Sequence, residues 1–403
     1  MPYNVADATR DMDDLIVRPA HVFKEKQDID VRIQHRAEAI DPARKTITGR
    51  NAAGEPFQIS YDKLLIATGA RPIIPDLPGV NSPGAMALKN LEDGRKIKAF
   101  IRDRNVKKVV ILGMGYIAFE MCEAFRARGI DVEMIKPRPL FIPWMNEQLA
   151  SIVKKEVEAN QVKVYLGQPI ERIEKNAKGL RIICPGLQLD GDMILLAVGV
   201  RPASEVAENA GLALGPGKSI AVDRMLRTSN ADIYAAGDCA DAYHVVTGQK
   251  SWIPLALRAN RAGWAVADNV LGGRVELQGV AGTAVFKIFD LEVARTGLSV
   301  EEARKAGFEP AEVVIQSRSR AHNHPGSSMI SVQLVGDKRT GRLLGAQMVG
   351  KEGAAHRINA PAVALHAKMS VEDFGQSDLA YAPPFGPSWD PLLTAANQLV
   401  KSV

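Results

Sequence analysis

The sequence predicts an α/β fold with a duplicated strand–helix architecture, followed by a C-terminal region of alternating strands and two helices. A strand, a glycine-rich turn, a helix and a second strand run through residues 107–135. Two apolar strands, at 63–67 and 194–198, lead into similar segments that hold Gly, one further residue, Arg and Pro, which indicates a duplicated architecture. After residue 282 the pattern changes to alternating strands, as in a separate domain.

Length and composition limit the classes of protein to which the chain can belong. Its 403 residues exceed one ordinary hydrophobic core, so two or three domains are expected. Hydrophobic residues make up 46% and charged residues 24%, as in soluble globular proteins. The net charge of +5, from 51 basic and 46 acidic residues, is too small to indicate binding of nucleic acid.

The chain shows no signal for a membrane or for secretion. There is no run of 18 apolar residues, so no membrane span is expected. The first 14 residues lack the basic and then apolar order of a secretory signal. Cys122, Cys184 and Cys239 form no CxxC pair, which excludes a disulfide framework and a zinc ribbon. We therefore expect no metal site and a reducing, cytoplasmic location.

Local periodicity predicts further elements along the chain. In sequence order they are a strand at 31–33, a helix at 91–102, a strand at 233–236, a helix at 254–270, strands at 331–335 and 343–349, and helices at 356–368 and 389–400.

The glycine-rich turn at 113–118 has the form of a dinucleotide-binding site. Gly113 permits a tight turn, and Gly115 lets the backbone approach a pyrophosphate whose charge the helix N-terminus favours. Ala118 replaces the third glycine, an allowed variant where the helix packs on the strand. A strand before and a strand after complete the unit, whereas a bare glycine motif would also suit an unrelated strand–helix turn.

The end of the second strand predicts which coenzyme is preferred. NAD-selective sites usually hold an acidic residue there, but this sequence has Lys136, with Arg138 close by. These cations would attract a 2′-phosphate, so the sequence favours NADPH. The alternative is that both are solvated loop cations.

The segment 231–240, Ala-Asp-Ile-Tyr-Ala-Ala-Gly-Asp-Cys-Ala, resembles the pattern by which two-dinucleotide flavoproteins bind FAD. The family is the pyridine nucleotide-disulfide oxidoreductases, and the resemblance extends over the whole chain. It implies that Asp238 hydrogen-bonds the ribityl chain of FAD and that Gly237 allows close approach.

The same resemblance implies further cofactor-binding residues. Tyr116 would lie against the flavin, and Glu120 would shape the nicotinamide pocket with it. The remaining implied residues line the crossing segments, the start of the dinucleotide helix and the helix that points at the flavin ring: Ala67, Thr68, Gly69, Ile117, Gly199, Pro254, Leu255 and Ala256.

The resemblance also implies the domain organisation. Two nested Rossmann-like domains are expected, an FAD-binding domain at 1–92 and 225–278 and an NAD(P)-binding domain at 93–224. A dimerisation domain at 279–403 would make the protein a homodimer. The FAD-binding domain is N-terminally incomplete, because the family's first glycine fingerprint and redox cysteine precede the position that matches Met1. A late-assigned start site, a fragment and a natural truncation would each explain this. None of the three cysteines matches the redox cysteine.

The C-terminal segment 378–391 resembles the branch of coenzyme A-disulfide reductases and NAD(P)H persulfide or polysulfide reductases. In that branch the residue matching Tyr381 reaches the partner subunit's active site, where its phenol would donate a proton. His324 stands where the branch often has a tyrosine, and it would supply protons in its place. The alternatives are a loop whose aromatic residues only pack and a structural histidine.

Three functions remain open from the sequence. The first is FAD-dependent transfer of hydride from NAD(P)H to a small disulfide, coenzyme A disulfide, persulfide or polysulfide, with Arg318 and Arg320 as candidates to meet coenzyme A phosphates. The second is an NAD(P)H oxidase of the same fold, and the third is a truncated, non-catalytic nucleotide-binding protein. The aromatic pattern around Tyr381 favours the first over the second, and the position of Met1 favours the third.

Overall fold

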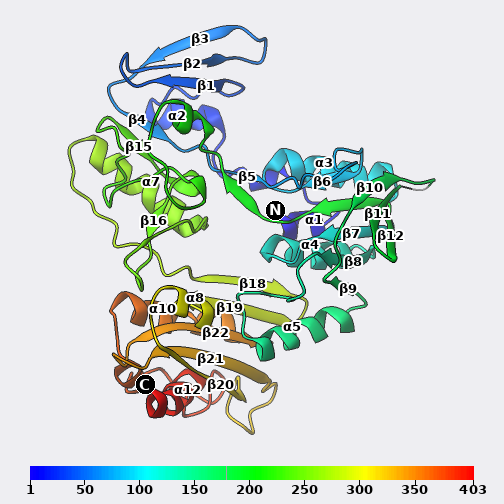
Figure 1. Ribbon diagram of the computed structural model, residues 1–403, viewed down its shortest axis with the longest axis vertical. Coiled ribbons are helices and arrows are strands. Elements are labelled where there is room, and N and C mark those ends of the chain that lie inside the picture. The colour runs from blue at the N-terminus through cyan, green and yellow to red at the C-terminus, as the bar shows by residue number, and fades with distance from the viewer. Residues whose placement is uncertain (178) are drawn as a thin grey trace.

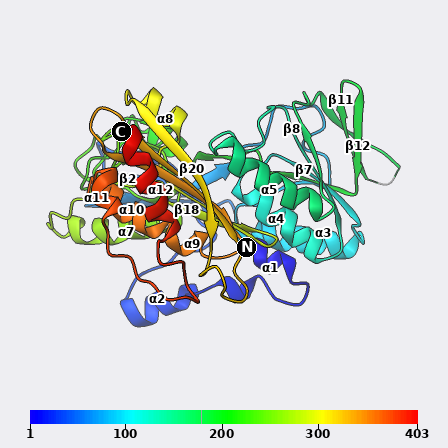
Figure 2. The ribbon, with the colours of Figure 1, turned by 90° about the horizontal axis from the view of Figure 1, so that it is seen from below.

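A parallel five-stranded sheet forms the central domain of the computed structural model, which describes residues 1–177 and 179–403 (Figure 1). In sheet order its strands are β6 (Ala85–Ala87), β13 (Met193–Leu196), β7 (Lys108–Leu112), β8 (Asp131–Lys136) and β9 (Lys163–Leu166). Figure 2 shows the helices of one face in a row: α3 (Leu91–Asp103), α4 (Tyr116–Ala127) and α5 (Glu147–Ala159). The other face packs against the meander of β10 (Arg172–Lys175), β11 (Leu180–Cys184) and β12 (Leu187–Gly191). The predicted Rossmann-like unit is thus confirmed.

Strand β7 is apolar throughout because both of its faces are covered. Val109 and Ile111 pack in the core beneath the helices, whereas Val110 and Leu112 pack beneath the meander. Alternate residues of a strand point to opposite faces, so a strand buried on both sides reads as a continuous apolar run. This burial fixes the direction in which the glycine-rich turn leaves the sheet.

The two similar Gly-containing segments pair with each other. β5 (Ala70–Pro72) and β14 (Val200–Pro202) are antiparallel, with Arg71 opposite Arg201. The duplicated pattern in the sequence therefore marks the two crossings between the first and the central domain.

The first domain contains two small sheets. One is a parallel pair, β4 (Leu64–Ile66) and β15 (Ile233–Ala235), and the other is the meander of β1 (Arg36–Asp41), β2 (Thr46–Arg50) and β3 (Pro56–Ser60). Ala207 and Ile220 pack with Ile66 in its core. Because β6 pairs in the central sheet and residues after β14 join the first domain, the boundaries predicted at 92/93 and 224/225 lie too late. Local patterns do not reveal such pairing.

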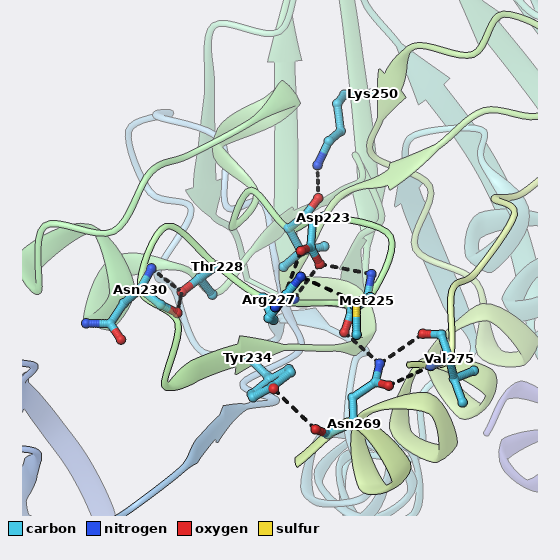
Figure 3. Close-up of polar contacts among 10 residues, drawn as sticks. Asp223, Met225, Arg227, Thr228, Asn230, Tyr234, Lys250, Asn269 and Val275 are labelled. Atoms are coloured by element: carbon cyan, nitrogen blue, oxygen red, sulfur yellow. Dashed lines mark hydrogen bonds and ion pairs between the residues drawn. The ribbon is translucent and has the colours of Figure 1, made fainter. Parts of the chain in front are cut away.

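Helix α7 (Ala256–Val270) is fixed at its C-terminal end by one buried amide (Figure 3). The Asn269 Nδ2 donates to the carbonyls of Met225 and Val275, each at 2.9 Å, and its Oδ1 accepts from the Val275 N–H at 2.7 Å. The Tyr234 hydroxyl donates to the Asn269 carbonyl at 3.4 Å. The helix therefore keeps a fixed direction relative to β15.

The C-terminal domain is an antiparallel sheet with helices packed on it. In sheet order its strands are β18 (Ala284–Ile288), β19 (Leu291–Gly297), β22 (Leu343–Gly350), β21 (Met329–Asp337) and β20 (Pro310–Arg318). Its helices are α8 (Val300–Lys305), α9 (Ala354–Arg357), α10 (Asn359–His366), α11 (Val371–Gly375), α12 (Pro391–Leu399) and the 3₁₀ turn η4 (Val400–Ser402). The predicted strands and helices of this region are confirmed.

The remaining elements are short: α1 (Pro2–Ala6), η1 (Asp13–Leu15), α2 (Ala20–Gln27), α6 (Glu205–Asn209), η2 (Pro216–Lys218), η3 (Gly237–Cys239), β16 (Ala242–Tyr243) and β17 (Lys250–Ser251). The strand predicted at 31–33 is wrong. Val31 and Ile33 are exposed there, and Gln34 has a left-handed φ of 58°, so this backbone pairs with no strand. In residues 1–177 and 179–403, no helix has the length and apolar character to span a bilayer.

The hairpin of β16 and β17 joins the first domain to the C-terminal domain. The Arg342 guanidinium donates to the carbonyls of Val245 and Val246, at 3.3 and 3.1 Å. His244 is buried beside them, and its Nδ1 accepts from the Val246 N–H at 3.2 Å. Burial lowers the pKa of His244 to about 4; Arg295, Arg342 and His366 also lower it, while Glu302 opposes the shift.

This buried imidazole makes the junction sensitive to acid. The folded-state pKa of His244 lies below its ordinary value of 6.5, so the unfolded chain binds the proton more tightly. The free energy of unfolding therefore keeps its full value above pH 6.5 and falls by about 3 kcal/mol as the pH is lowered towards 4. We expect His244→Asn, whose side-chain oxygen replaces the Nδ1 acceptor, to flatten this part of the pH profile. Denaturant titrations of both proteins across the window measure it, and parallel profiles would refute the assignment.

Candidate functional site

Gly113 stands where three strand ends converge. Its N–H donates to the Ile135 carbonyl at 2.9 Å, and its φ is 118°. A Cβ at this position would lie 2.2 Å from the Ala197 carbonyl oxygen, closer than any real contact. Only glycine fits, because β7, β8 and β13 end side by side here.

Gly115 serves a different purpose from Gly113. It is the N-cap of α4, and a Cβ there would meet no protein atom within 4 Å. The first N–H groups of a helix have no acceptor within it, and they favour an anion. Ala118 is fully buried beneath the turn, and Ile117 is exposed at its rim. The cradle therefore fits a dinucleotide pyrophosphate.

Glu120 lies one turn further along α4 and is held by the N-terminal helix α1. Its Oε1 accepts from the Tyr3 hydroxyl at 3.3 Å. Burial raises the pKa of Glu120, although the hydrogen bond from Tyr3 opposes the shift. Burial and the neighbouring carboxylate raise the pKa of Tyr3 to about 12. Glu120 is thus a fixed hydrogen-bond acceptor next to the dinucleotide turn.

The ring of Tyr116 packs on the C-terminal domain. Its centroid lies 5.7 Å from that of Trp144 and 5.2 Å from that of Phe286 on β18. Burial raises the pKa of its phenol. Tyr116 therefore links the dinucleotide turn to the C-terminal sheet, and its contact with a flavin stays a prediction.

The two cations at the end of β8, Lys136 and Arg138, have different environments. Lys136 is 8% exposed, and its Nζ donates to the carbonyls of Leu140 and Phe141, at 2.8 and 3.3 Å. Burial lowers the pKa of Lys136. Arg138 is exposed. The expectation that both cations face a coenzyme is corrected: Lys136 braces the loop, and Arg138 carries the accessible charge.

Two hydrogen bonds join the crossing segments, one donated by a side chain and one by the backbone. The Thr68 hydroxyl donates to the Ala203 carbonyl at 2.5 Å, and the Ala203 N–H donates to the Gly69 carbonyl at 2.9 Å. Gly69 and Gly199 have φ of 71° and 120°. Ala67 is exposed, and a Cβ at Gly69 would meet no protein atom within 4 Å, which leaves room for a cofactor at this edge.

Asp238 lies on the loop 237–241, which follows β15 and faces the start of α7. Gly237 begins this loop with a φ of 81°. The Asp238 Oδ2 accepts from the Lys89 Nζ at 2.9 Å, and its carbonyl accepts from the Trp252 Nε1 at 2.8 Å. Lys89 lies 149 residues away, and the sequence pattern did not identify it.

Helix α7 starts beside this loop. Pro254 and Leu255 precede it, with Leu255 as N-cap, and Ala256 is its exposed first residue. The carboxylate of Asp238 is partly accessible, and the first N–H groups of a helix have no acceptor within it, so this corner could accept and donate hydrogen bonds to a bound molecule. The residues present therefore fit the part of FAD that the resemblance assigns to Asp238 and the start of α7, namely the ribityl chain and the flavin ring.

The three cysteines are buried. Burial raises the pKa of Cys122 to about 12 and also raises that of Cys184. The Cys239 Sγ donates to the carbonyls of Ile66 and Ala236, at 3.4 and 3.2 Å. A reactive cysteine needs an accessible thiolate, so these three are structural, as the sequence indicates.

Tyr381 and His324 lie on two loops of the C-terminal domain that contact each other. Tyr381 is 53% exposed and His324 is partly buried. The Ala321 N–H donates to the Pro383 carbonyl at 3.0 Å, which joins the loops. The His324 Nδ1 lies 3.0 Å from the Pro325 carbonyl, which can only accept, so Nδ1 carries a hydrogen; among the described residues no hydrogen bond involves Nε2.

One guanidinium holds the Tyr381 loop in place. The Arg357 Nε donates to Asp390 Oδ2 at 2.8 Å, and its Nη2 donates to the carbonyls of Ser319 and Phe385, at 3.1 and 2.5 Å. Both side chains of the Arg357–Asp390 pair are mostly buried. The exposed phenol of Tyr381 is therefore carried by a fixed loop.

Arg320 does not match the expectation that it meets a coenzyme A phosphate. Its Nε and Nη2 donate to the two carboxylate oxygens of Glu352, each at 2.7 Å, and its Nη1 donates to the Pro325 carbonyl. Most of its hydrogen-bonding capacity is used within the protein. Arg318, on the edge strand β20, is partly exposed and remains a candidate.

Comparison with known proteins agrees with this geometry. The family model described as pyridine nucleotide-disulphide oxidoreductase matches residues 1–263, and the model of its dimerisation domain matches residues 283–392. The NAD(P)H sulfur oxidoreductase (CoA-dependent) of Pyrococcus furiosus is 34% identical over 400 residues, covering 99% of this chain and 89% of that protein. The NADH oxidase of Methanocaldococcus jannaschii is 33% identical over 407 residues, covering 100% of this chain and 90% of that protein.

A solved structure is similar over nearly the whole fold. The NAD-dependent persulfide reductase from A. fulgidus superposes with a TM-score of 0.95 at 34% identity, covering 99% of this chain and 75% of that one. The C-terminal domain that supports a homodimer is included in this match. The chain therefore belongs to the pyridine nucleotide-disulphide oxidoreductases and is a flavin-dependent, NAD(P)H-using enzyme.

Proposed function

We propose that this enzyme reduces a small sulfur compound, a disulfide, coenzyme A disulfide, persulfide or polysulfide, with electrons from NAD(P)H. The observation that carries the proposal is the exposed phenol of Tyr381 on a loop that Arg357 fixes to the dimerisation domain. Two-electron cleavage of a sulfur–sulfur bond leaves two thiolate or sulfide anions that take up protons, and a phenol on a rigid loop is suited to protonate one of them. The partner in the homodimer would receive this loop at its own site.

Different residues of the chain are proposed to bind the coenzyme, to bind FAD and to donate protons. Gly115 and the start of α4 would hold the coenzyme pyrophosphate, with Glu120 orienting the nicotinamide. Asp238 and the start of α7 would hold FAD. When bound, FAD accepts hydride from NAD(P)H and passes the electrons onward. His324 is the proposed second proton donor, through its Nε2 when the ring carries a hydrogen on both nitrogens. Three buried, unpaired thiols favour a reducing, cytoplasmic location.

The choice of electron acceptor tests the proposal. We expect the FAD-supplemented protein to oxidise NADPH without oxygen when coenzyme A disulfide or polysulfide is added, with thiol or sulfide formed in proportion. A relative is an NADH oxidase, so oxygen is the second candidate acceptor. Oxygen consumption that matches NADPH oxidation, without turnover of any sulfur compound, would replace the proposal with that function.

We further propose that the enzyme accepts NADPH through Arg138. The exposed guanidinium stands on a loop braced by Lys136, with a proline on either side, so it is presented at low entropic cost. Arg138→Gln should raise the KM for NADPH about tenfold and leave that for NADH unchanged. Lys155→Gln, an exposed charge on α5, is the control. Equal KM changes for both coenzymes in Arg138→Gln would contradict the assignment.

Tyr381→Phe isolates the proton-donating step. The substitution removes the hydroxyl and keeps the ring, so it should lower kcat for the sulfur substrate about 100-fold. The rate at which NADPH reduces bound flavin should stay unchanged, because that step does not use the phenol. Stopped-flow and steady-state measurements on the same variant separate the steps. A slower flavin reduction with normal turnover afterwards would rule out the proposed role.

A further inference from the structure

A buried cation in the first turn of α7 holds the loop that presents Asp238. Arg258 is 6% exposed. Its Nη1 donates to the Gly237 carbonyl at 2.8 Å, and its Nη2 donates to the carbonyls of Ala240, at 3.0 Å, and Asp241. One guanidinium thus binds three carbonyls of the loop 237–241 and fixes its conformation on either side of Asp238.

This position is unfavourable for a cation on grounds of stability alone. The positive end of the helix macrodipole repels a cation in the first turn. Desolvation by burial lowers the pKa of Arg258, although the nearby carboxylates of Asp241 and Asp238 oppose the shift. The carboxylate of Asp241 accepts from the Lys250 Nζ and the Val222 N–H, and in the described part of the chain Arg258 hydrogen-bonds only carbonyl oxygens.

Contacts at both ends of α7 hold the Arg258 guanidinium in a fixed position. Asn269 fixes the far end of α7 by its contacts with Met225 and Val275 (Figure 3), and the three carbonyls fix the near end. The Lys89 ammonium, at 2.9 Å from Asp238 Oδ2, adds a second cation that contacts the loop. The loop 237–241 at the start of α7 is therefore held by two cations, Arg258 and Lys89, beside the carboxylates of Asp238 and Asp241.

We propose that Arg258 is a positioning residue for FAD that also favours the reduced cofactor. By binding the carbonyl side of the loop, it directs the Asp238 carboxylate towards the cofactor. Its fixed positive charge stabilises the electron-richer reduced flavin more than the oxidised form. The inference rests on the binding of FAD at Asp238 given above, and it concerns how tightly FAD binds and at which potential it is reduced.

Three variants of the full chain test this inference. Arg258→Gln removes the charge and most of the donors, and Arg258→Lys keeps the charge but cannot reach three carbonyls. Arg261→Gln, an exposed arginine on the same helix, is the matched control. FAD titrations followed by fluorescence give the dissociation constant, and equilibration with a redox dye gives the ratio of affinities for reduced and oxidised FAD.

We expect Arg258→Gln to weaken FAD binding about tenfold, as for the loss of charge-assisted hydrogen bonds. The ratio of affinities for reduced and oxidised FAD should fall about tenfold, which lowers the two-electron potential by about 30 mV. Arg258→Lys should bind FAD more weakly but restore the potential, and Arg261→Gln should match the wild type.

Unchanged affinity and potential in Arg258→Gln would overturn the inference and leave the proposed function intact. If that variant does not fold, Arg258→Lys decides: wild-type affinity for FAD, or a potential that fails to recover, overturns it. A wild-type chain that binds no FAD would overturn the inference and the flavin part of the proposed function together.

Discussion

Gly115→Val should greatly weaken the binding of NAD(P)H without affecting folding. A Cβ at Gly115 meets no protein atom within 4 Å, so the substituted chain has room for it. The added methyl groups would instead occupy the approach of the pyrophosphate to the α4 N-terminus. Losing two charge-assisted hydrogen bonds there raises the dissociation constant about 100-fold. Titration of the FAD-free protein with NADPH, monitored by nicotinamide fluorescence, measures the effect, because no flavin is then present to oxidise the coenzyme.

Gly113→Ala is the matched comparison, two residues earlier in the same turn. Its Cβ would lie 2.2 Å from the Ala197 carbonyl oxygen, on a backbone with a φ of 118°. We expect it to lower the free energy of unfolding by about 3 kcal/mol or more. The two glycines thus separate binding from stability. A Gly115→Val protein with wild-type affinity for NADPH would show that the pyrophosphate binds elsewhere.

Lys250→Met should be the most destabilising substitution near the flavin site. Asp241 is fully buried, and its Oδ1 accepts from the Lys250 Nζ at 2.8 Å and the Val222 N–H at 3.0 Å. Removing the ammonium leaves a buried carboxylate with a single donor. Breaking such a pair costs about 3–5 kcal/mol. The loop 237–241 should loosen as well, since Asp241 ends it.

The double variant Asp241→Asn, Lys250→Met tests the cause. It removes the uncompensated charge and should recover part of the lost stability in urea titrations. Lys305→Met breaks an exposed pair with Glu301 and should cost less than about 1 kcal/mol. If Lys250→Met costs no more than Lys305→Met, the buried pair does not stabilise the protein.

The chemistry that depends on short stretches of sequence was predictable. Gly113 and Gly115 lie between a buried strand and a helix, and three successive local patterns specify that geometry. The alternation after residue 282 likewise predicted the C-terminal sheet. The pairing of β5 with β14 could be anticipated only as a repeated pattern, since its meaning depends on contacts over more than a hundred residues.

What the sequence could not provide is the direction and partner of each charged side chain. Lys136 and Arg138 look equivalent in the sequence, yet one ammonium turns inward to two carbonyls. Arg320 looks free until its bidentate contact with Glu352 is seen. Lys89 contacts Asp238, which is 149 residues away in the sequence. Arg258 contacts the same loop from a position about 20 residues further along the chain. The spacing of apolar and polar residues in the sequence does not predict such side-chain contacts.

The most direct test of the central claim follows the visible absorbance of FAD on the protein without oxygen. NADPH should bleach the flavin absorbance of the wild type, and coenzyme A disulfide or polysulfide added next should restore it. Gly115→Val at the same NADPH concentration should bleach far more slowly. A flavin that NADPH does not bleach, or that only oxygen restores, would contradict the account.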